Sequence, residues 1–261
     1  MLRAFSTAAT GMTEQQMNVD IIANNLANIN TNGFKRSQIE FQDLLYLKLE
    51  EPGAEVVAGL TSPSGLEIGS GVRAASTVKV YTSGELQGTS RPLDIAITGE
   101  GFLQVSMPDG STKYTRDGAL IINANGNLVT STGFLLEPAI TIPTDAMSID
   151  IGKDGTVNVT NSAGTSSVAG NIQLARFLNP AGLSSEGDNL VAETEASGTP
   201  VTGTPGDSGF GYIQSGFLEK SNVQMVTELV NLITAQRAYE INSRAIRAGD
   251  DMLRTANEIA R

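Results

Sequence analysis

The side chains that could catalyse a reaction in this sequence are carboxylates. The 261 residues include no histidine, cysteine or tryptophan, which excludes imidazole bases, thiolate nucleophiles and His or Cys ligation of zinc, haem or iron–sulfur clusters. Two carboxylates facing each other across a cleft could still hydrolyse a glycosidic bond. The acidic residues of the strand-rich middle of the chain are Asp94, Glu100, Asp109, Asp117 and Glu137.

Spacing alone does not bring any two of these carboxylates together. Solvated carboxylates at turns and strand edges are commoner than matched catalytic pairs, so we expect no enzymatic activity. A secreted carbohydrate-active enzyme or binding module is the alternative from another class of function. It requires a carboxylate pair within about 10 Å across a cleft.

Motifs for cofactors and metals fail on closer inspection. Reading Asn123–Asn127 as a calcium loop places Ile121 where the first acidic ligand is needed. Gly99-Glu100-Gly101 has Gln104 in place of the third glycine of a dinucleotide fingerprint, and the sequence contains no Gly-Lys-Ser/Thr phosphate loop. We therefore expect no cofactor and no metal site.

Charge is distributed unevenly along the chain. The 17 Lys and Arg residues against 28 Asp and Glu residues give a net charge of −11, the wrong sign for binding nucleic acid. Residues 46–220 hold 9 basic and 19 acidic residues, so −10 of this charge lies in the middle and the ends are nearly neutral. The acidic middle should repel its own copies, whereas the ends can pack against copies at little electrostatic cost.

Neither a membrane-spanning segment nor a signal peptide is expected. The sequence has no run of about 18 apolar residues. Its first ten residues lack the continuous apolar stretch and the cleavage site of a signal peptide. We expect a chain that does not span a membrane and carries no ordinary secretion signal.

Apolar residues recur at helical spacing near the N-terminus, which predicts a helix over residues 1–30 that stops at Asn32-Gly33. Asparagines at 24, 25, 28 and 30 are unusual in a helix because they compete for backbone hydrogen bonds. They indicate either a fraying last turn or buried amides that fix the helix register between subunits. The predicted seam is Leu2, Phe5, Ala9, Met12, Gln16, Val19, Ala23 and Leu26.

The last 40 residues repeat this design. Ser221–Gln224 resembles a capping box, Glu240 with Arg244 and Asp250 with Arg254 form favourable i,i+4 pairs, and several alanines allow close helix approach. The two stripes are too narrow for a globular core, so an ordinary antiparallel helix pair and a coiled coil that also packs against other copies both stay open. The second seam is Met225, Leu229, Leu232, Gln236, Tyr239, Ile246 and Leu253.

Short alternating apolar runs separated by turn residues predict a β domain between the helices. Hairpin turns are expected at Pro108–Gly110, Asn125–Asn127 and Asp154-Gly155. Residues 46–72 are interrupted by prolines and glycines, which predicts an extended excursion or long hairpin, and residues 195–211 read as a long loop. The expected strands are 93–97, 102–105, 120–122, 128–129, 149–151, 157–159 and 172–177.

The predicted fold class is therefore α+β. Residues 1–45 and 216–261 form a discontinuous axial domain for polymerisation, in which the long terminal helices pair like a coiled coil. The extended excursion occupies residues 46–72. A mostly antiparallel, β-rich outer domain occupies residues 73–215.

Several motifs resemble one family. Residues 23–36, Ala-Asn-Asn-Leu-Ala-Asn-Ile-Asn-Thr-Asn-Gly-Phe-Lys-Arg, resemble the N-terminal signature of the axial proteins of the bacterial flagellum, which are the rod, hook and hook-associated proteins. Residues 221–223, 228–230 and 236–242 resemble the family's C-terminal signature. Gly99–Leu103 and Tyr114–Gly118 resemble motifs of the larger rod proteins and the hook protein.

Within this family, the length and the segments 63–73 and 137–143 are most similar to the distal rod proteins of the basal body. The resemblance covers essentially the whole chain. A proximal rod paralogue of similar size is the alternative within the family.

The resemblance implies a structural polymer, the drive shaft that carries motor torque through the periplasm towards the hook. It further implies export through the flagellar type III apparatus without a cleaved signal. The implied partners are further copies of the chain, proximal rod proteins, the hook protein and the P-ring and L-ring proteins around the rod. Because a repeated non-closing rotation generates a filament, the contact between copies must be head to tail.

The seams and the resemblance together assign residues to assembly. By family analogy, the excursion contacts neighbouring subunits and stiffens the rod; its residues are Tyr46, Pro52, Pro63, Gly65, Leu66 and Val72. The expected assembly residues are Leu2, Phe5, Met12, Val19, Asn24, Asn25, Leu26, Asn28, Thr31, Gly33, Phe34, Met225, Leu229, Leu232, Gln236, Arg237, Tyr239, Glu240, Asn242, Ile246 and Leu253.

Overall fold

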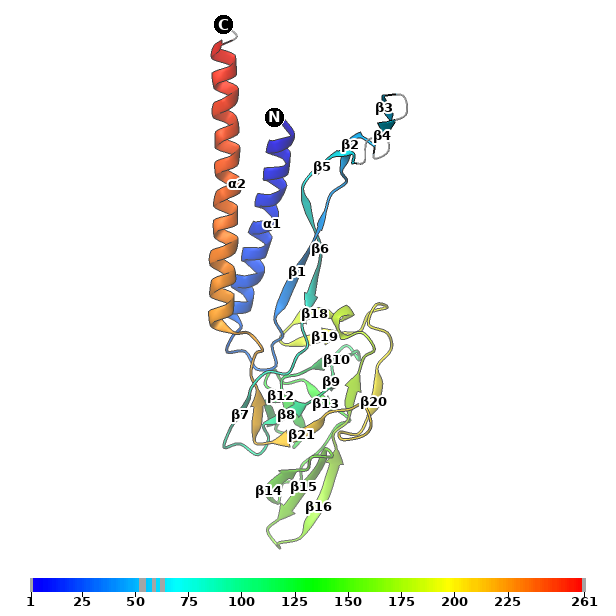
Figure 1. Cartoon of the computed structure of the whole chain (residues 1–261). Coiled ribbons are helices and arrows are strands. Elements are labelled where there is room, and N and C mark those ends of the chain that lie inside the picture. Colours follow the sequence, from blue (N-terminus) through cyan, green and yellow to red (C-terminus); the bar gives the residue numbers. More distant parts are fainter. Residues whose placement is uncertain (1, 52–54, 58–59, 62–63, 260–261) are drawn as a thin grey trace. The chain divides into compact units, whose positions relative to one another are not determined.

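A computed structural model describes residues 2–51, 55–57, 60–61 and 64–259 (Figure 1). The described residues divide into two compact units, each built from segments far apart in the sequence. The first unit comprises Met1–Leu26, Ser37–Val78 and Gln224–Arg261, and the second comprises Ala27–Arg36 and Lys79–Val223. The fold class is α+β, as predicted: two terminal helices pack together, and the central domain is an antiparallel β domain.

The first unit contains the two long helices, α1 (Leu2–Ala27) and α2 (Met225–Ile259). They run antiparallel and approach closely at two glycines (Figure 1). A Cβ atom on Gly249 would lie 2.8 Å from the Phe5 ring, and one on Gly11 would lie 2.8 Å from Asn242 Nδ2. A side chain at Gly249 would collide with the Phe5 ring and one at Gly11 would displace the Asn242 amide, so glycine permits this helix spacing.

The first helix ends at Ala27, about one turn before the predicted end at residue 30. The chain leaves the helix in a turn in which the Thr31 N–H donates to the Asn28 carbonyl at 3.2 Å. Gly33 follows with a φ of 66°, and a Cβ atom there would lie 2.6 Å from the Arg116 carbonyl carbon. The predicted left-handed residue is therefore present, but it belongs to the turn after the helix instead of ending the helix itself.

The predicted capping box at the start of the second helix is wrong. The helix begins at Met225, and the Glu228 N–H donates to the Gln224 carbonyl at 3.0 Å. The Ser221 hydroxyl accepts a bond from the Val223 N–H at 3.3 Å, outside the helix. The box pattern lies one turn too early because residues 221–223 belong to the β domain.

The first unit also contains a hairpin arm, which we define as residues 37–78. Strand β1 (Ser37–Asp43) pairs with β6 (Val72–Lys79), and β2 (Leu47–Glu50) pairs antiparallel with β5 (Leu66–Ile68). Further out, β3 (Glu55–Val57) pairs antiparallel with β4 (Leu60–Thr61). The arm belongs to the same unit as the helices and includes the predicted excursion of residues 46–72.

The second unit is a β domain whose main sheet has the order β11-β12-β13-β9-β10-β19-β18, with β17 pairing both β9 and β20. The pairs β8–β21 and β7–β22 and the meander β14-β15-β16 complete it. The strand pairs among the described residues of this domain are antiparallel. The bounds are β7 Leu86–Gly88, β8 Ile95–Thr98, β9 Phe102–Ser106, β10 Thr112–Thr115, β11 Leu120–Ile122, β12 Leu128–Thr130, β13 Leu135–Glu137, β14 Ala146–Ile151, β15 Thr156–Asn161, β16 Ser166–Asn171, β17 Leu174–Arg176, the 3₁₀ helix η1 Pro180–Gly182, β18 Ser184–Gly187, β19 Leu190–Ala192, β20 Val201–Gly203, β21 Tyr212–Ser215 and β22 Phe217–Glu219.

Three hairpin turns of this domain are confirmed where the sequence predicted them. They join β9 to β10, β11 to β12 and β14 to β15. Gly110, Gly126 and Gly155 occupy them with φ values of 83°, 82° and 83°, which a glycine adopts without strain. Local turn chemistry thus sets the register of these strand pairs.

The core of the β domain has two parts. The larger part consists of aliphatic side chains from most of the strands, with Leu103, Leu120, Leu128 and Leu174 fully buried. The smaller part is aromatic: Tyr114 meets Phe177 edge to face with ring centres 4.8 Å apart, and Phe102 packs against the same ring. This second part borders the site described next.

Candidate functional site

A buried cluster of three charged side chains lies in the β domain. Glu219, at the end of β22, is completely buried, with side-chain exposure of 0%. Its Oε1 lies 2.5 Å from Lys35 Nζ, and its Oε2 lies 3.2 Å from Arg116 Nη1. One carboxylate therefore pairs with two cations, contributed by segments up to 184 residues apart in the sequence.

Backbone groups complete the cluster. Glu219 Oε1 accepts a hydrogen bond from the Gly84 N–H at 2.8 Å, and Lys35 Nζ donates to the Thr82 carbonyl at 2.8 Å. Arg116 donates from Nη2 to the Gly99 carbonyl at 2.6 Å and from Nη1 to the Ile97 carbonyl at 3.3 Å. Buried charges are tolerated only when they are paired and hydrogen-bonded in this way.

Burial also affects the Lys35 ammonium. It lowers the pKa of Lys35, because the charged form loses hydration, and nearby Arg116 lowers it further; Glu219 acts in the opposite direction. The ion pair and hydrogen bond with Glu219 are thus what favours the charged form of Lys35 in this interior. The cluster links Lys35 of the N-terminal motif to Arg116 of the Tyr114–Gly118 motif.

The segments that enter and leave the β domain are tied together near this cluster. The Asn222 side chain accepts a bond from the Arg36 N–H at 2.8 Å and donates to the Val80 carbonyl at 2.8 Å. The Gly33 N–H donates to the Glu219 carbonyl at 2.8 Å. Residues 33–36, 80–84 and 219–222 therefore form one hydrogen-bonded junction.

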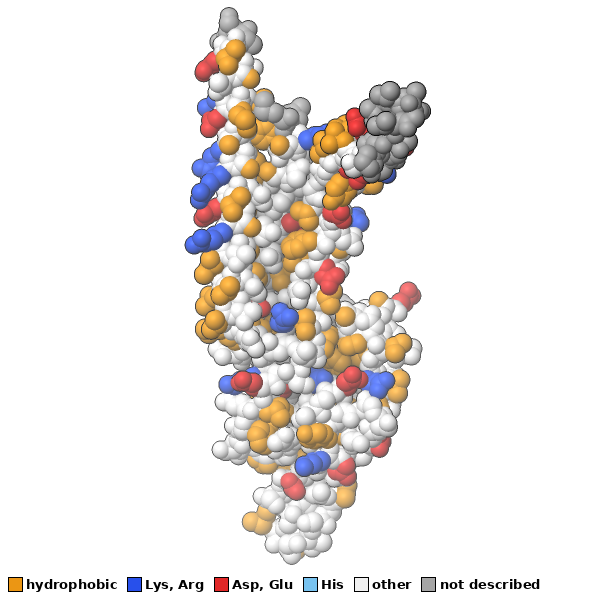
Figure 2. Space-filling view, viewed as in Figure 1, with side chains coloured by type: hydrophobic (Ala, Val, Ile, Leu, Met, Phe, Trp, Pro, Cys, Tyr) orange, Lys and Arg blue, Asp and Glu red, His pale blue; other side chains and the backbone are white. Residues whose placement is uncertain are grey.

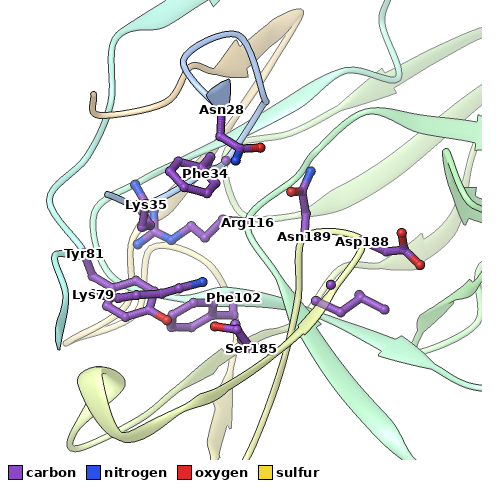
Figure 3. Close-up of a pocket in the computed structure, with 14 residues that line it drawn as sticks. Asn28, Phe34, Lys35, Lys79, Tyr81, Phe102, Arg116, Ser185, Asp188 and Asn189 are labelled. Atoms are coloured by element: carbon purple, nitrogen blue, oxygen red, sulfur yellow. The ribbon is translucent and has the colours of Figure 1, made fainter. Parts of the chain in front are cut away.

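A cavity of about 230 Å³ lies beside the ion cluster (Figure 3). Phe34, Lys79, Tyr81 and Phe102 contribute to its lining together with Lys35 and Arg116, which also belong to the cluster. Burial raises the pKa of Tyr81 to about 12 and lowers the pKa of Lys79. The turn between β18 and β19 closes the opposite wall through Asp188 and Asn189, whose φ values of 50° and 60° suit a tight hairpin.

The five carboxylates that the sequence offered for catalysis are mostly engaged in local structure. Asp109 accepts bonds from Ser111, which lower its pKa, and Glu137 accepts one from the Thr112 hydroxyl at 3.0 Å. Asp117 accepts a bond from the Ala119 N–H at 3.1 Å. Burial raises the pKa of Asp117, with a smaller contribution from the neighbouring charge of Asp94.

These two neighbouring carboxylates, Asp94 and Asp117, do not line the cavity beside the ion cluster. Glu100 lies with its carboxylate 3.8 Å from Arg176 and lines a second cavity of about 280 Å³, in which it is the acidic residue. Among the described residues, no group of three or more acidic side chains could hold a metal ion. Within the same described part of the chain, no helix has the length and hydropathy needed to cross a membrane.

One predicted assembly residue of the first helix, Phe5, lies at its contact with the second, and others are half-buried. Phe5 packs at Gly249, and Met12, Val19 and Leu26 are half-buried. The side chain of Leu2 lies outside the described residues. The first seam is thus at least partly occupied within one copy of the chain.

Asn25 is used within the chain. The prediction gave this amide a possible role between subunits. It is almost fully buried, donates from Nδ2 to the Ser37 carbonyl and accepts from the Ser37 N–H, both at 2.8 Å. Asn24 is exposed, whereas Asn28 accepts a bond from the Thr31 hydroxyl at 3.1 Å. The buried amide therefore fixes the end of α1 to the start of the arm.

The second helix has two apolar faces, and the predicted seam mixes them. Its most buried positions are Glu228, Ala235 and Gly249, and Leu232, Asn242, Ile246 and Leu253 are half-buried. The other predicted residues, Met225, Leu229, Gln236, Arg237, Tyr239 and Glu240, are exposed. The predicted ion pairs are confirmed, with Arg244 Nη2 3.5 Å from Glu240 Oε2 and Arg254 Nη2 3.0 Å from Asp250 Oδ2.

The predicted residues of the excursion lie on the hairpin arm. Tyr46 and Leu66 are exposed, while Gly65 and Val72 are half-buried. Pro52 and Pro63 lie outside the described residues. Exposed apolar side chains continue along the arm at Leu45, which is 91% exposed, and at Leu49.

Sequence reasoning missed Glu219, Lys79 and Tyr81. None of them belongs to a recognisable motif, and Glu219 meets its partners only in the folded domain. The one sequence feature that could have indicated a buried Glu219 is its position directly after the apolar pair Phe217-Leu218, near the point where the chain leaves the β domain. Lys35 and Arg116 belong to the motifs named above, but no sequence pattern indicated the partner of either side chain.

Three family models match separate parts of the chain. The model described as flagella basal body rod protein matches residues 5–35, and the flagellar hook protein FlgE/F/G D1 domain matches residues 96–159. The C-terminal model of the flagellar basal body rod FlgEFG proteins matches residues 214–259. Together with the fold, these matches define the class, that of the rod and hook subunits of the bacterial flagellum.

Curated relatives narrow this class. The flagellar basal-body rod protein FlgG of Buchnera aphidicola subsp. Schizaphis graminum is 45% identical over 260 residues, which cover 99% of this chain and 100% of the relative. FlgG of Borreliella burgdorferi is 45% identical over all of both chains, and FlgG of Caulobacter vibrioides is 45% identical over 99% of each. The chain belongs to the FlgG family of flagellar basal-body rod proteins, the structural proteins of the distal rod.

Proposed function

We propose that copies of this chain polymerise head to tail into the helical distal rod, which transmits motor torque to the hook. The observation that carries the proposal is an exposed apolar face on α2, opposite the face that packs against α1. Val226, Val230, Ile233 and Ile241 follow the spacing i, i+4, i+7 and i+15 of one helix face. Their exposed fractions are 75%, 56%, 51% and 64%.

This face resembles an interface more than an ordinary helix surface. Figure 2 shows hydrophobic side chains gathered over the first part of α2, with Lys and Arg side chains further along. Single exposed apolar residues are normal, but a contiguous apolar patch marks a contact site. Removing such surface from water contributes about 25 cal/mol per Å², so pairing with a neighbouring copy stabilises a polymer.

The proposal also covers the absence of catalysis, the partners and the location of the chain. The chain works as a structural element and not as an enzyme, which agrees with the local hydrogen bonds of its strand-region carboxylates. Its partners are further copies, the proximal rod proteins, the hook protein and the P-ring and L-ring proteins. It reaches the periplasm and outer membrane through the flagellar type III apparatus without a cleaved signal.

The hairpin arm supplies the second kind of contact between copies. Its exposed apolar side chains, among them Leu45, Leu49 and Leu66, have few partners within one copy. Contacts from the arm to a neighbouring subunit would resist bending of the rod. The arm is thus the proposed origin of rod stiffness.

Deleting residues 46–66 is expected to leave polymerisation intact and to make the polymer bend more easily. The deletion removes the exposed side chains of Tyr46, Leu49 and Leu66 but keeps Leu45 and the pairing of β1 with β6. Persistence length in electron micrographs measures the effect, with the full-length polymer as reference. An unchanged persistence length would show that the arm does not stiffen the rod.

The test of the proposed function is electron microscopy of the purified chain at high concentration. The comparison is a variant lacking residues 1–26 and 224–261, which keeps Asn222 and hence its bonds to Arg36 and Val80. We expect straight filaments from the full-length chain and none from the trimmed variant. Filaments from both would refute assembly through the helices.

A further inference from the structure

The cavity beside the ion cluster carries an excess of positive charge. Lys35, Lys79 and Arg116 line it, with Asp188 as the acidic residue of the lining. Glu219 is shared by Lys35 and Arg116, so one carboxylate offsets two cations. Lys79 makes no side-chain hydrogen bond or ion pair within the part of the chain that the structure describes.

Two polar atoms around the cavity also lack partners among the described residues. Tyr81 Oη and Arg116 Nε are buried and make no hydrogen bond. Arg116 as a whole residue is only 6% exposed, so water does not readily reach it. Buried polar groups are nearly always hydrogen-bonded in native proteins. Unpaired donors beside an unpaired lysine indicate a missing acceptor that carries negative charge.

The cavity suits a carboxylate in size and chemistry. Its volume of about 230 Å³ exceeds several times the roughly 30 Å³ of one water molecule. Burial raises the pKa of Tyr81 to about 12, so its hydroxyl stays a donor at neutral pH. In Figure 3 the Asp188 carboxylate points away from the labelled lysines, which leaves the space between Lys79 and the opposite wall open.

Neighbouring copies offer many carboxylates. The β domain, residues 27–36 and 79–223, holds 9 basic and 15 acidic residues, a net charge of −6, so adjacent β domains in a polymer repel each other. Asp145, Asp150 and Glu195 are exposed, and no side-chain partner is found for them among the described residues. An acidic side chain of one copy inserted into the positive cavity of another would offset part of this repulsion and join the two copies. A free small anion in the cavity would offset charge but would not join the copies.

We propose that this cavity is a carboxylate socket, in which an acidic side chain of a neighbouring copy pairs with Lys79 Nζ and accepts a hydrogen bond from Tyr81 Oη. The proposal rests on the proposed function, because it requires copies to lie side by side in a polymer. The socket couples β domains, in addition to the contacts made by the helices and the arm. It gives an acidic domain an attractive contact with its own copies.

Zero-length cross-linking of the assembled full-length chain tests the socket. Copies with natural nitrogen and ¹⁵N-labelled copies are mixed, polymerised and treated with a carbodiimide, which joins an amine to a carboxylate in contact with it. We expect Lys79 to be joined to an Asp or Glu peptide of the other isotope. Lys113, whose Nζ lies 2.8 Å from Glu186 Oε2 in the same copy, provides the internal control.

Variants give an independent measurement. Lys79→Gln and Tyr81→Phe should each raise the critical concentration for polymerisation about tenfold, as expected for losing one partly buried polar contact. Lys113→Gln removes an equal charge from an ion pair within one copy and should leave it nearly unchanged. Unfolding of the monomer reports whether each variant folds normally.

Three outcomes oppose the proposals, and they are distinguishable. Filaments in which Lys79 links only within its own copy, or does not react while Lys113 does, would overturn the socket. Unchanged critical concentrations in both Lys79→Gln and Tyr81→Phe would overturn it as well. A wild-type chain that forms no filaments would instead contradict the proposed function, and the socket would fail with it.

Discussion

Replacing Glu219 by alanine is expected to destabilise the β domain by about 3–5 kcal/mol, because it leaves two buried cations without their counter-ion. The carboxylate is completely buried, pairs with Lys35 and Arg116, and accepts a hydrogen bond from the Gly84 N–H. Urea unfolding measures the loss. The chain lacks tryptophan, so the near-ultraviolet circular dichroism of the packed rings, including Tyr114, reports on this domain.

Matched variants distinguish the stability that comes from the buried ion pairs from the stability that comes from side-chain packing. Lys35→Met removes one of the two cations and leaves the pair between Arg116 and Glu219, so it should cost less than Glu219→Ala. Glu186→Ala breaks the more exposed pair with Lys113 and should cost under about 1 kcal/mol. If Glu219→Ala were no more destabilising than Glu186→Ala, the buried cluster would not hold the domain together.

The size of this effect follows from the position of the cluster in the chain. Lys35 lies where the chain enters the β domain, and Glu219 lies three residues before Asn222, where the chain leaves it. Asn222 ties the entering and leaving segments through their backbones. The ion cluster and the Asn222 amide therefore hold the entering and leaving segments of the β domain together.

The sequence predicted those features that depend on neighbouring residues. Hairpin turns at Gly110, Gly126 and Gly155 were correct because glycine's positive φ is a local requirement. The i,i+4 pair of Asp250 and Arg254 was correct for the same reason. The two helices were found because a period of 3.6 residues extends over many turns.

Features set by the folded chain were not predictable. The Glu219 cluster joins residues 184 positions apart, and no local pattern gives such a contact. The helix α2 has two apolar faces, and periodicity does not show which of them meets α1. On the face that meets α1, Gly249 lies against Phe5, and a search for large apolar residues does not find a glycine.

The exposed face of α2 allows a test of assembly that spares the monomer. Val230→Asp is expected to abolish polymerisation, because burying an unpaired charge in an apolar contact costs several kcal/mol, which corresponds to more than about a hundredfold in affinity. Val230 is 56% exposed in the single chain and lies opposite the contact with α1. Electron microscopy and sedimentation measure the polymer, and helical circular dichroism reports on the monomer.

Asn231→Asp is the matched control, since it adds the same charge to an exposed position of the same helix. Asn231 lies about 100° around the helix axis from Val230, and it is not three or four residues from Val226, Val230 or Ile233. Leu26→Asp is less informative because Leu26 is half-buried within one copy, so this substitution would disturb the monomer as well. Normal filaments from Val230→Asp would show that this face is not a contact between copies, whereas filaments from Asn231→Asp alone would assign polymerisation to the face of Val226, Val230 and Ile233.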